Sequence, residues 1–256
     1  MEYIDFHSWP RKEHFRFFSS LSFPFYGVTL SLDVTNLRSY VKAHGLSFYY
    51  ALIYATLTAM NGLPDFLYKI RGDRIVRHDR LHPSFVVLDE DTHLIKIVNV
   101  PLDGTMEAFC RRAEEQVLTQ KEPFPDAQQE NRDDLVYISC TPWFSFTSLS
   151  NEMDCDPDDS IPRITWGKYE ERNGRLILPY AVQLNHRLLD GWHVAQLLQA
   201  LAQSHHIAVA HFRARVGNDK LRAIAERKAR RETVVSRRAR LVFHGIWHRL
   251  QASRAF

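Results

Sequence analysis

The 256-residue sequence has few cysteines, and none of them belongs to a recognisable pair motif. Cys110, Cys140 and Cys155 are the three, and no two of them have CxxC spacing. A sparse, odd number of cysteines argues against a disulfide framework and is typical of a protein that stays in a reducing compartment. We therefore expect a cytoplasmic protein.

The sequence also lacks a hydrophobic run long enough to cross a membrane. The longest apolar stretch, from Leu46 to Leu63, is interrupted by several polar residues, whereas a spanning helix needs about 20 mostly apolar residues. The first residues, MEYIDFHSWPRKEHF, mix acidic and basic side chains without an apolar core. The sequence thus predicts a buried core helix at residues 47–62, no secretory signal, and a soluble protein.

Common motifs for metals and nucleotides are missing as well. The chain contains no GxxxxGK[ST] or GxGxxG pattern, and its histidines, cysteines and carboxylates do not recur with metal-ligand spacing. We therefore predict neither a bound metal nor a phosphate-binding loop.

Charge is distributed unevenly along the chain. Residues 205–256 hold 13 Lys and Arg against three Asp and Glu, a net charge of +10, whereas residues 1–204 hold 20 against 27, a net charge of −7. A shift of this size predicts a boundary between two parts. We expect a folded domain at 1–204 and a basic, helical extension at 205–256.

Within the first part, hydrophobic periodicity predicts interleaved strands and helices. Alternating or β-branched runs predict strands at 28–34, 84–88, 94–100, 135–141, 143–148, 165–171 and 175–184, with a hairpin at 68–77. Helical spacing of apolar residues predicts helices at 11–18, 35–43, 47–62, 105–120 and from residue 191 onward. This pattern favours an α/β fold built from a mixed sheet layered with helices.

The segment QLNHRLLDGWH at residues 183–193 is the strongest candidate for chemistry. A strand leads to His186, and Asp190 and Gly191 close a turn ahead of a helix. A neutral imidazole at a strand end is well placed to accept a proton near pH 7. Taken alone, His-x3-Asp-Gly at a turn is more often structural than catalytic.

Four further segments, however, fall in register with a known family. The segment WPRKEHF at 9–15 is similar to a family pattern W-x-R-K/R-E-H-F, TPWFSFTS at 141–148 to P-W-V-x-F-x-S-F, and TWGKY at 165–169 to T-M-x-K-Y; Leu-Pro at 178–179 precedes the histidine strand. Together with HxxxDG, these segments resemble the chloramphenicol acetyltransferase superfamily, which includes dihydrolipoyl acyltransferases. The resemblance covers about residues 3–203.

The resemblance implies a role for five residues. His186 would be the general base, Ser148 would donate a hydrogen bond to the oxyanion, Thr165 would hold a water against the intermediate, and Asp190 and Arg11 would form a buried ion pair that shapes the turn. Without the family pattern, we would interpret Ser148 and Arg11 as ordinary surface residues.

The resemblance also implies the assembly and the reaction. It implies a two-layer sandwich of mixed sheet and helices, a homotrimer with active sites between subunits, and acetyl-CoA as co-substrate without a permanently bound cofactor. It further implies O-acetylation of a chloramphenicol-type antibiotic. It identifies no residues for binding acetyl-CoA, and we interpret Lys168, Tyr169 and His193 as structural.

The sequence departs from the family at two places near the predicted site. Asn185 stands where antibiotic-inactivating members have the first of two histidines, and residues 89–100 lack the pocket aromatics of those members. Residues 23–26 are either acceptor-pocket or core aromatics. These departures leave open a second hypothesis, acyl transfer to another hydroxyl or amine acceptor in a biosynthetic pathway.

The basic extension is the third departure. It contains RKARRETVVSRRAR at 227–240, followed by an apolar and basic stretch at 241–250. A solvated terminal helix is the simplest interpretation, and contact with a membrane surface or nucleic acid is the alternative. A non-catalytic protein that keeps the fold and binds a polyanion through the tail is therefore a third hypothesis.

Overall fold

The computed structural model describes residues 1–126, 129, 132–153, 155–204 and 208–209. By backbone contacts the chain divides into two units, Met1–Ala210 and His211–Phe256, and the description below concerns the first. Apart from residues 208 and 209, the predicted extension lies outside the described residues, so its helix and its binding partners stay predictions.

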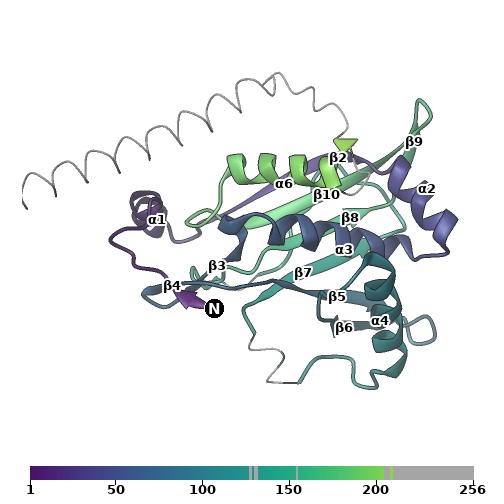
Figure 1. Cartoon of the computed structure of the whole chain (residues 1–256), viewed down its shortest axis with the longest axis horizontal. Helices are drawn as coiled ribbons and strands as arrows, with labels where there is room; N and C mark the ends of the chain where they lie inside the picture. The colour runs from purple at the N-terminus through teal and green to yellow at the C-terminus, as the bar shows by residue number, and fades with distance from the viewer. Residues whose placement is uncertain (127–128, 130–131, 154, 205–207, 210–256) are drawn as a thin grey trace, which may run out of the picture. The chain divides into compact units, whose positions relative to one another are not determined.

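Most strands of the described chain form one mixed sheet (Figure 1). Its order is β11-β2-β10-β8-β7-β5-β6, with β9 paired to β10. The pairs β5–β7 and β7–β8 are parallel and the others antiparallel. Its strands are β2 (Phe25–Asp33), β5 (His82–Leu88), β6 (Ile95–Asn99), β7 (Leu135–Thr141), β8 (Arg163–Gly167), β9 (Glu170–Arg172), β10 (Arg175–Asn185) and β11 (Ala208–Val209). A smaller sheet contains β1 (Glu2–Tyr3), β3 (Tyr68–Arg71) and β4 (Arg74–Arg77).

Most helices form a second layer against the large sheet, and α1 lies to one side of it (Figure 1). Helix α3 is its centre, because α2, α4 and α6 all contact it. The helices are α1 (Lys12–Ser19), α2 (Thr35–His44), α3 (Phe48–Asn61), α4 (Met106–Thr119) and α6 (Gly191–Ser204), with a 3₁₀ turn η1 (Pro64–Leu67). No helix among the described residues is both long and apolar enough to cross a membrane.

Local sequence signals account for where these helices begin. The side chains of Ser47 and Thr105 accept hydrogen bonds from the N–H groups of Tyr50 and Ala108 and so cap α3 and α4. The residues of α3 are apolar on nearly all sides and eight of them are buried, as expected of a helix between a sheet and other helices. The core helix predicted at 47–62 is confirmed.

One predicted strand is wrong. Residues 143–148 form no strand in the structure; they meet the end of β8, where the carbonyl oxygen of Phe144 accepts one hydrogen bond from the N–H of Lys168 at 2.8 Å. A Cβ at Gly167 would lie 2.8 Å from the carbonyl oxygen of Phe144 and 3.0 Å from the Phe146 ring. The absent side chain at Gly167 therefore lets this segment pack closely across the strand end instead of pairing alongside it.

The strand predicted at 165–171 is also divided, into β8 and β9. The remaining strands and the hairpin at 68–77 are confirmed with shifts of a few residues at their ends. Strand β10 pairs with β2 over its last nine residues and with β8 nearer its middle. It therefore lies inside the sheet, and its end at Asn185 is fixed by its neighbours.

Candidate active site

His186 follows directly on the last residue of β10. Its N–H donates to the carbonyl oxygen of Pro24 at 2.7 Å, which carries the pairing between β2 and β10 one step beyond Asn185 and Phe25. The backbone of the predicted base is therefore fixed by sheet pairing, as the sequence pattern of a histidine at a strand end predicts.

The imidazole of His186 lies between two aromatic rings. Its centroid is 3.9 Å from that of Phe18 in α1, with 24° between the planes, and 4.5 Å from that of Tyr26 in β2. Within the described part of the chain, the ring nitrogens of His186 form no hydrogen bond. The sequence did not predict the contact of Phe18 with His186, because the two residues are 168 positions apart. Two aromatic rings thus contact the imidazole, and its nitrogens have no hydrogen-bond partner among the described residues.

The surroundings of His186 favour its uncharged form. Burial lowers the pKa of His186 below its ordinary value, and the positive charge of Arg11 lowers this pKa further, while the charge of Asp190 opposes them. The imidazole is therefore neutral at pH 7 and able to accept a proton.

Arg11 binds the turn that follows β10. Its Nε donates to the carbonyl oxygen of Arg187 at 3.1 Å, its Nη2 to that of His186 at 3.2 Å, and its Nη1 to Oδ2 of Asp190 at 2.9 Å. The side chains of Arg11 and Asp190 are 12% and 31% exposed, so the ion pair is partly buried. The planar guanidinium thus joins three points of one turn.

Asp190 also organises the start of α6. Its Oδ1 accepts from the N–H of Trp192 at 2.9 Å, and Nδ1 of His193 lies 3.0 Å from the same oxygen. Burial alone would raise the pKa of Asp190, but the hydrogen bond from Arg11 and the nearby charges lower it to about 2. Asp190 is therefore charged at neutral pH. On its far side His193 approaches Asp65 at 3.6 Å.

The other two predicted site residues, Ser148 and Thr165, are not part of the turn that follows β10. Ser148 is exposed, and its hydroxyl has no hydrogen-bond partner among the described residues. Thr165 in β8 is 2% exposed, and its Oγ1 donates to Oδ1 of Asn151 at 2.7 Å. The proton of Thr165 is therefore already used within the chain, and only its lone pairs remain to accept from a water. The catalytic roles of all five predicted residues stay proposals.

A cavity of about 340 Å³ opens where β7 and β8 end. Its walls are largely aromatic, and the exposed side chain of Lys168 lies at it. The lining residues are Phe48, Tyr49, Cys140, Pro142, Trp166, Gly167, Lys168, Tyr169 and Leu178. Lys168 and Tyr169, predicted to be structural, lie at this cavity because the fold brings them opposite the start of α3.

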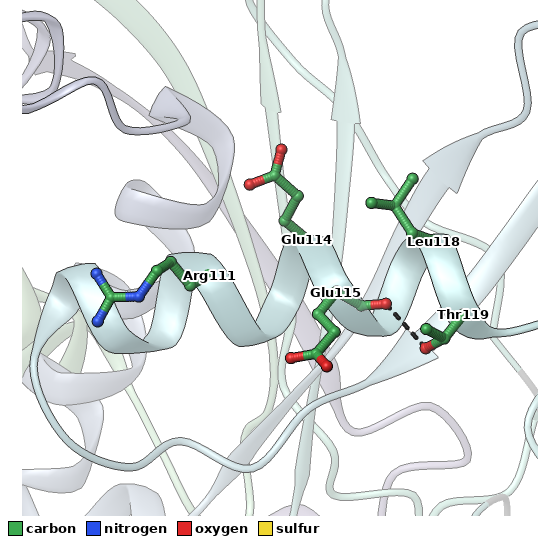
Figure 2. A pocket seen from close by; sticks show the side chains of 5 residues that line it. All are labelled: Arg111, Glu114, Glu115, Leu118 and Thr119. Atoms are coloured by element: carbon green, nitrogen blue, oxygen red, sulfur yellow. Dashed lines mark hydrogen bonds between the residues drawn. The ribbon is translucent and has the colours of Figure 1, made fainter.

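A second hollow, of about 290 Å³, lies on α4 alone (Figure 2). Arg111, Glu114, Glu115, Leu118 and Thr119 line it, and Figure 2 shows Glu114 and Glu115 pointing apart. It contains none of the predicted site residues and has no wall from another element. In the described residues no group of three or more His, Cys, Asp or Glu is placed to hold a metal ion.

Comparison with known proteins identifies the family. The chloramphenicol acetyltransferase family model matches residues 1–202. Chloramphenicol acetyltransferases from Klebsiella sp and Escherichia coli are each 30% identical over 203 residues, covering 78% of this chain and 91% of the relative. That of Proteus mirabilis is 28% identical over 200 residues, covering 78% of this chain and 92% of the relative.

Solved structures show the same fold. A chloramphenicol acetyltransferase superposes with a TM-score of 0.72 at 27% identity, covering 78% of this chain and 97% of the other. The cubic core of the pyruvate dehydrogenase multienzyme complex shares the fold, with a TM-score of 0.52 at 19% identity over 72% of this chain and 82% of the other. The predicted fold and family are confirmed: the chain belongs to the chloramphenicol acetyltransferase family, a family of acetyl-CoA-dependent O-acetyltransferases.

Proposed function

We propose that this protein transfers the acetyl group of acetyl-CoA to a hydroxyl group of a small aromatic molecule of the chloramphenicol type, with His186 as general base. One observation carries the proposal. The imidazole has a lowered pKa, is stacked on Phe18, and has no partner for its ring nitrogens among the described residues. Such a group is ready to receive the proton of an alcohol.

The reaction needs no covalent enzyme intermediate. A ring nitrogen of His186 takes the hydroxyl proton while the alcohol oxygen forms a bond to the thioester carbon. The resulting tetrahedral intermediate collapses, the carbon–sulfur bond breaks, and the proton on His186 passes to the departing thiolate. The products are the acetyl ester and free coenzyme A. A positioned base contributes about 10²–10⁴ to the rate.

We further propose that a neighbouring copy completes the site. The exposed hydroxyl of Ser148 has no partner in the described chain, and the nearby rings of Trp143 and Phe144 are 63% and 53% exposed. Contact between copies would cover these rings and bring Ser148 to the intermediate formed beside His186, in a homotrimer. One oxyanion donor contributes roughly 3–4 kcal/mol to such a reaction.

The aromatic cavity beside β8 is our candidate for the nucleotide part of coenzyme A. The rings of Phe48 and Tyr169, whose centroids are 5.8 Å apart, supply apolar walls suited to a purine. The ammonium group of Lys168 and the guanidinium of Arg38, whose Nε donates to Tyr169 Oη at 3.4 Å, supply positive charge suited to phosphate. Neutralising Lys168 is expected to raise KM for acetyl-CoA and leave KM for the acceptor unchanged.

The hairpin of β5 and β6 favours a second candidate acceptor class. In this hairpin Leu94 and Ile95 are 67% and 47% exposed, and residues 89–100 contain no Phe, Tyr or Trp. The absence of these side chains from the segment supports transfer to another hydroxyl or amine. The cysteines Cys110, Cys140 and Cys155 are free, which supports a reaction in the reducing cytoplasm.

Release of free thiol tests the function. The full chain is incubated with acetyl-CoA and either chloramphenicol or a panel of alcohols and amines, and thiol appearance is followed together with mass spectrometry of the acceptor. We expect an acetyl ester of chloramphenicol, and loss of turnover in His186→Ala with nearly unchanged thermal stability.

The outcomes separate the three hypotheses. Turnover with other acceptors but not chloramphenicol would support the biosynthetic alternative. No thiol release with any acceptor, together with salt-sensitive retention on DNA or anionic vesicles, would support a binding protein. Ordinary activity in His186→Ala would refute the proposed mechanism.

A further inference from the structure

The end of β10 is attached by side chains to a loop segment, Pro157–Asp159, that precedes β8. Asn185 is the centre of this attachment. Its Nδ2 donates to the carbonyl oxygens of Pro157 at 2.8 Å and Asp159 at 2.9 Å. Its Oδ1 accepts from the N–H of Arg187 at 3.1 Å. Both amide protons and the amide oxygen are therefore bound within the chain.

Arg187 strengthens the same attachment from the other side of His186. Its Nη2 donates to the carboxylate of Asp158 at 2.9 Å and to the carbonyl oxygen of Pro157. Its guanidinium lies over the ring of Phe15 in α1, 5.1 Å from the centroid. Asn185 and Arg187 are 4% and 5% exposed, so one partner of each of these hydrogen bonds is shielded from water, which strengthens it relative to a contact between two exposed groups.

In the sequence His186 lies between Asn185 and Arg187, but its ring packs against Phe18 and Tyr26. The side chains of Asn185 and Arg187 bind the loop segment, while the ring between them lies against Phe18 and Tyr26. Three successive residues therefore have their side chains fixed by packing or hydrogen bonding. Rotation of the His186 backbone would break several of these hydrogen bonds at once.

We propose that Asn185 is a positioning residue, which sets the direction of the His186 ring by binding the catalytic turn to the loop segment Pro157–Asp159. The inference rests on the proposed role of His186 as base. Asn185 is not a catalytic residue, because none of its hydrogen-bonding atoms is left for substrate.

The chemistry of the site explains why an amide stands at this position. Two carbonyl oxygens and one N–H group surround the side chain. An asparagine offers two donors on one nitrogen and an acceptor beside it. A neutral histidine offers one donor, and an aspartate offers none and would add charge beside Asp158. Asparagine therefore matches a loop that presents two carbonyl oxygens to the turn.

Magnetic resonance of the His186 ring tests the inference without any substrate. Protons held over the face of Phe18 are expected upfield of those of histidines without a stacked ring, and His186→Ala distinguishes them from the protons of His44, which stacks on Tyr40 at 4.1 Å between centroids. In full-length Asn185→Leu, which keeps size but loses every side-chain hydrogen bond of Asn185, the His186 signals should move to the positions of histidines without a stacked ring. In Asn185→His, which keeps one donor, they should lie between these positions and those of the wild type.

A matched variant separates positioning from general loss of stability. Asn61, at the end of α3, forms a similar amide pair, donating to the carbonyl oxygen of Leu81 at 3.0 Å and accepting from its N–H at 2.7 Å. Asn61→Leu should lower thermal stability comparably, because both changes leave polar groups unpaired, yet leave the His186 signals in place. Identical His186 signals in wild type, Asn185→Leu and Asn185→His would overturn the proposal.

Kinetics give the second measurement. If the protein acetylates an acceptor, Asn185→Leu should lower kcat by about 10- to 100-fold, as expected for a misdirected catalytic group, and leave KM for acetyl-CoA nearly unchanged. Unchanged kcat in that variant would count against positioning. If the wild type acetylates nothing, the proposed function fails, while the resonance measurement still decides whether Asn185 directs the ring.

Discussion

The rings of Phe18 and His186 lie nearly face to face, 3.9 Å apart between centroids. One ring comes from α1 near the start of the chain and the other from the end of β10. Phe18 removes one face of the imidazole from water, and burial is the largest cause of the lowered pKa of His186. The stacking therefore helps to keep His186 uncharged at neutral pH.

Replacing Phe18 should shift the pH dependence of activity. In Phe18→Ala the imidazole gains water, so the pKa of His186 should rise toward its ordinary value. Because the neutral form is the base, the acidic limb of the kcat/KM profile should move to higher pH. Profiles of wild type and variant between pH 5 and 8 measure the shift.

Phe124→Ala serves as the control for this change, since that ring is 56% exposed and belongs to the loop after α4. Its pH profile should coincide with that of the wild type. A Phe18→Ala profile with an unmoved acidic limb would show that the stacked ring does not tune the base.

The Arg11–Asp190 pair should contribute to both stability and turnover. Arg11→Lys keeps the charge but loses the planar group that joins the carbonyl oxygens of His186 and Arg187 to Asp190. We expect a loss of about 1.5–3 kcal/mol in the free energy of unfolding, typical of hydrogen bonds to charged groups, with a lower kcat. Urea unfolding of Arg11→Lys, Asp190→Asn and the double variant measures the coupling. Additive losses would contradict a direct interaction.

Local sequence patterns were sufficient to predict most of the elements of this fold. Alternating or β-branched runs identified most of the strands, and helical spacing of apolar residues identified the helices, because these signals depend on neighbours in the chain. For residues 143–148 the same patterns predicted a strand that does not form. Their aromatic side chains are typical of a strand, but the segment packs over Gly167, a contact that local composition does not report.

The candidate site was predictable only in part. His186 and Asp190 lie within one short motif, and Arg11 was assigned through resemblance. The partners of Asn185 are backbone carbonyl oxygens 26 and 28 positions away, and a carbonyl oxygen has no signature in sequence. The aromatic cavity likewise combines α3 with the ends of β7 and β8, so only the folded chain reveals it.

A buried lysine should make stability depend on pH. Lys69 is fully buried, and its Nζ donates to the carbonyl oxygen of Phe66 at 3.4 Å. Burial lowers the pKa of Lys69 to about 8, although the charges of Asp133, Asp134 and Asp159 oppose the shift. Above about pH 8 the folded lysine loses its proton before the unfolded one does. The free energy of unfolding should therefore rise with pH until about 10.5.

Lys69→Met should remove this rise and stabilise the protein at pH 7. Methionine has a similar length and no charge to bury, and replacing a buried charge by a packed apolar group often gains about 1–4 kcal/mol. Urea unfolding at pH 7, 8, 9 and 10 compares the variant with the wild type. Equal slopes against pH in both proteins would show that Lys69 is not the titrating group.

A site shared between copies predicts complementation between two inactive variants. Ser148→Ala should lower kcat by about 10²–10³-fold without loss of thermal stability, because the side chain is exposed and unpartnered in the described chain, whereas the similarly exposed Ser150→Ala should remain active. His186→Ala should be inactive by loss of the base. In a ring of three copies containing both variants, one interface joins an intact His186 to an intact Ser148. Co-expressed and purified as mixed rings through two tags, the pair should recover about one third of wild-type turnover. A site contained within a single copy would recover none, because each chain then lacks one of its two groups.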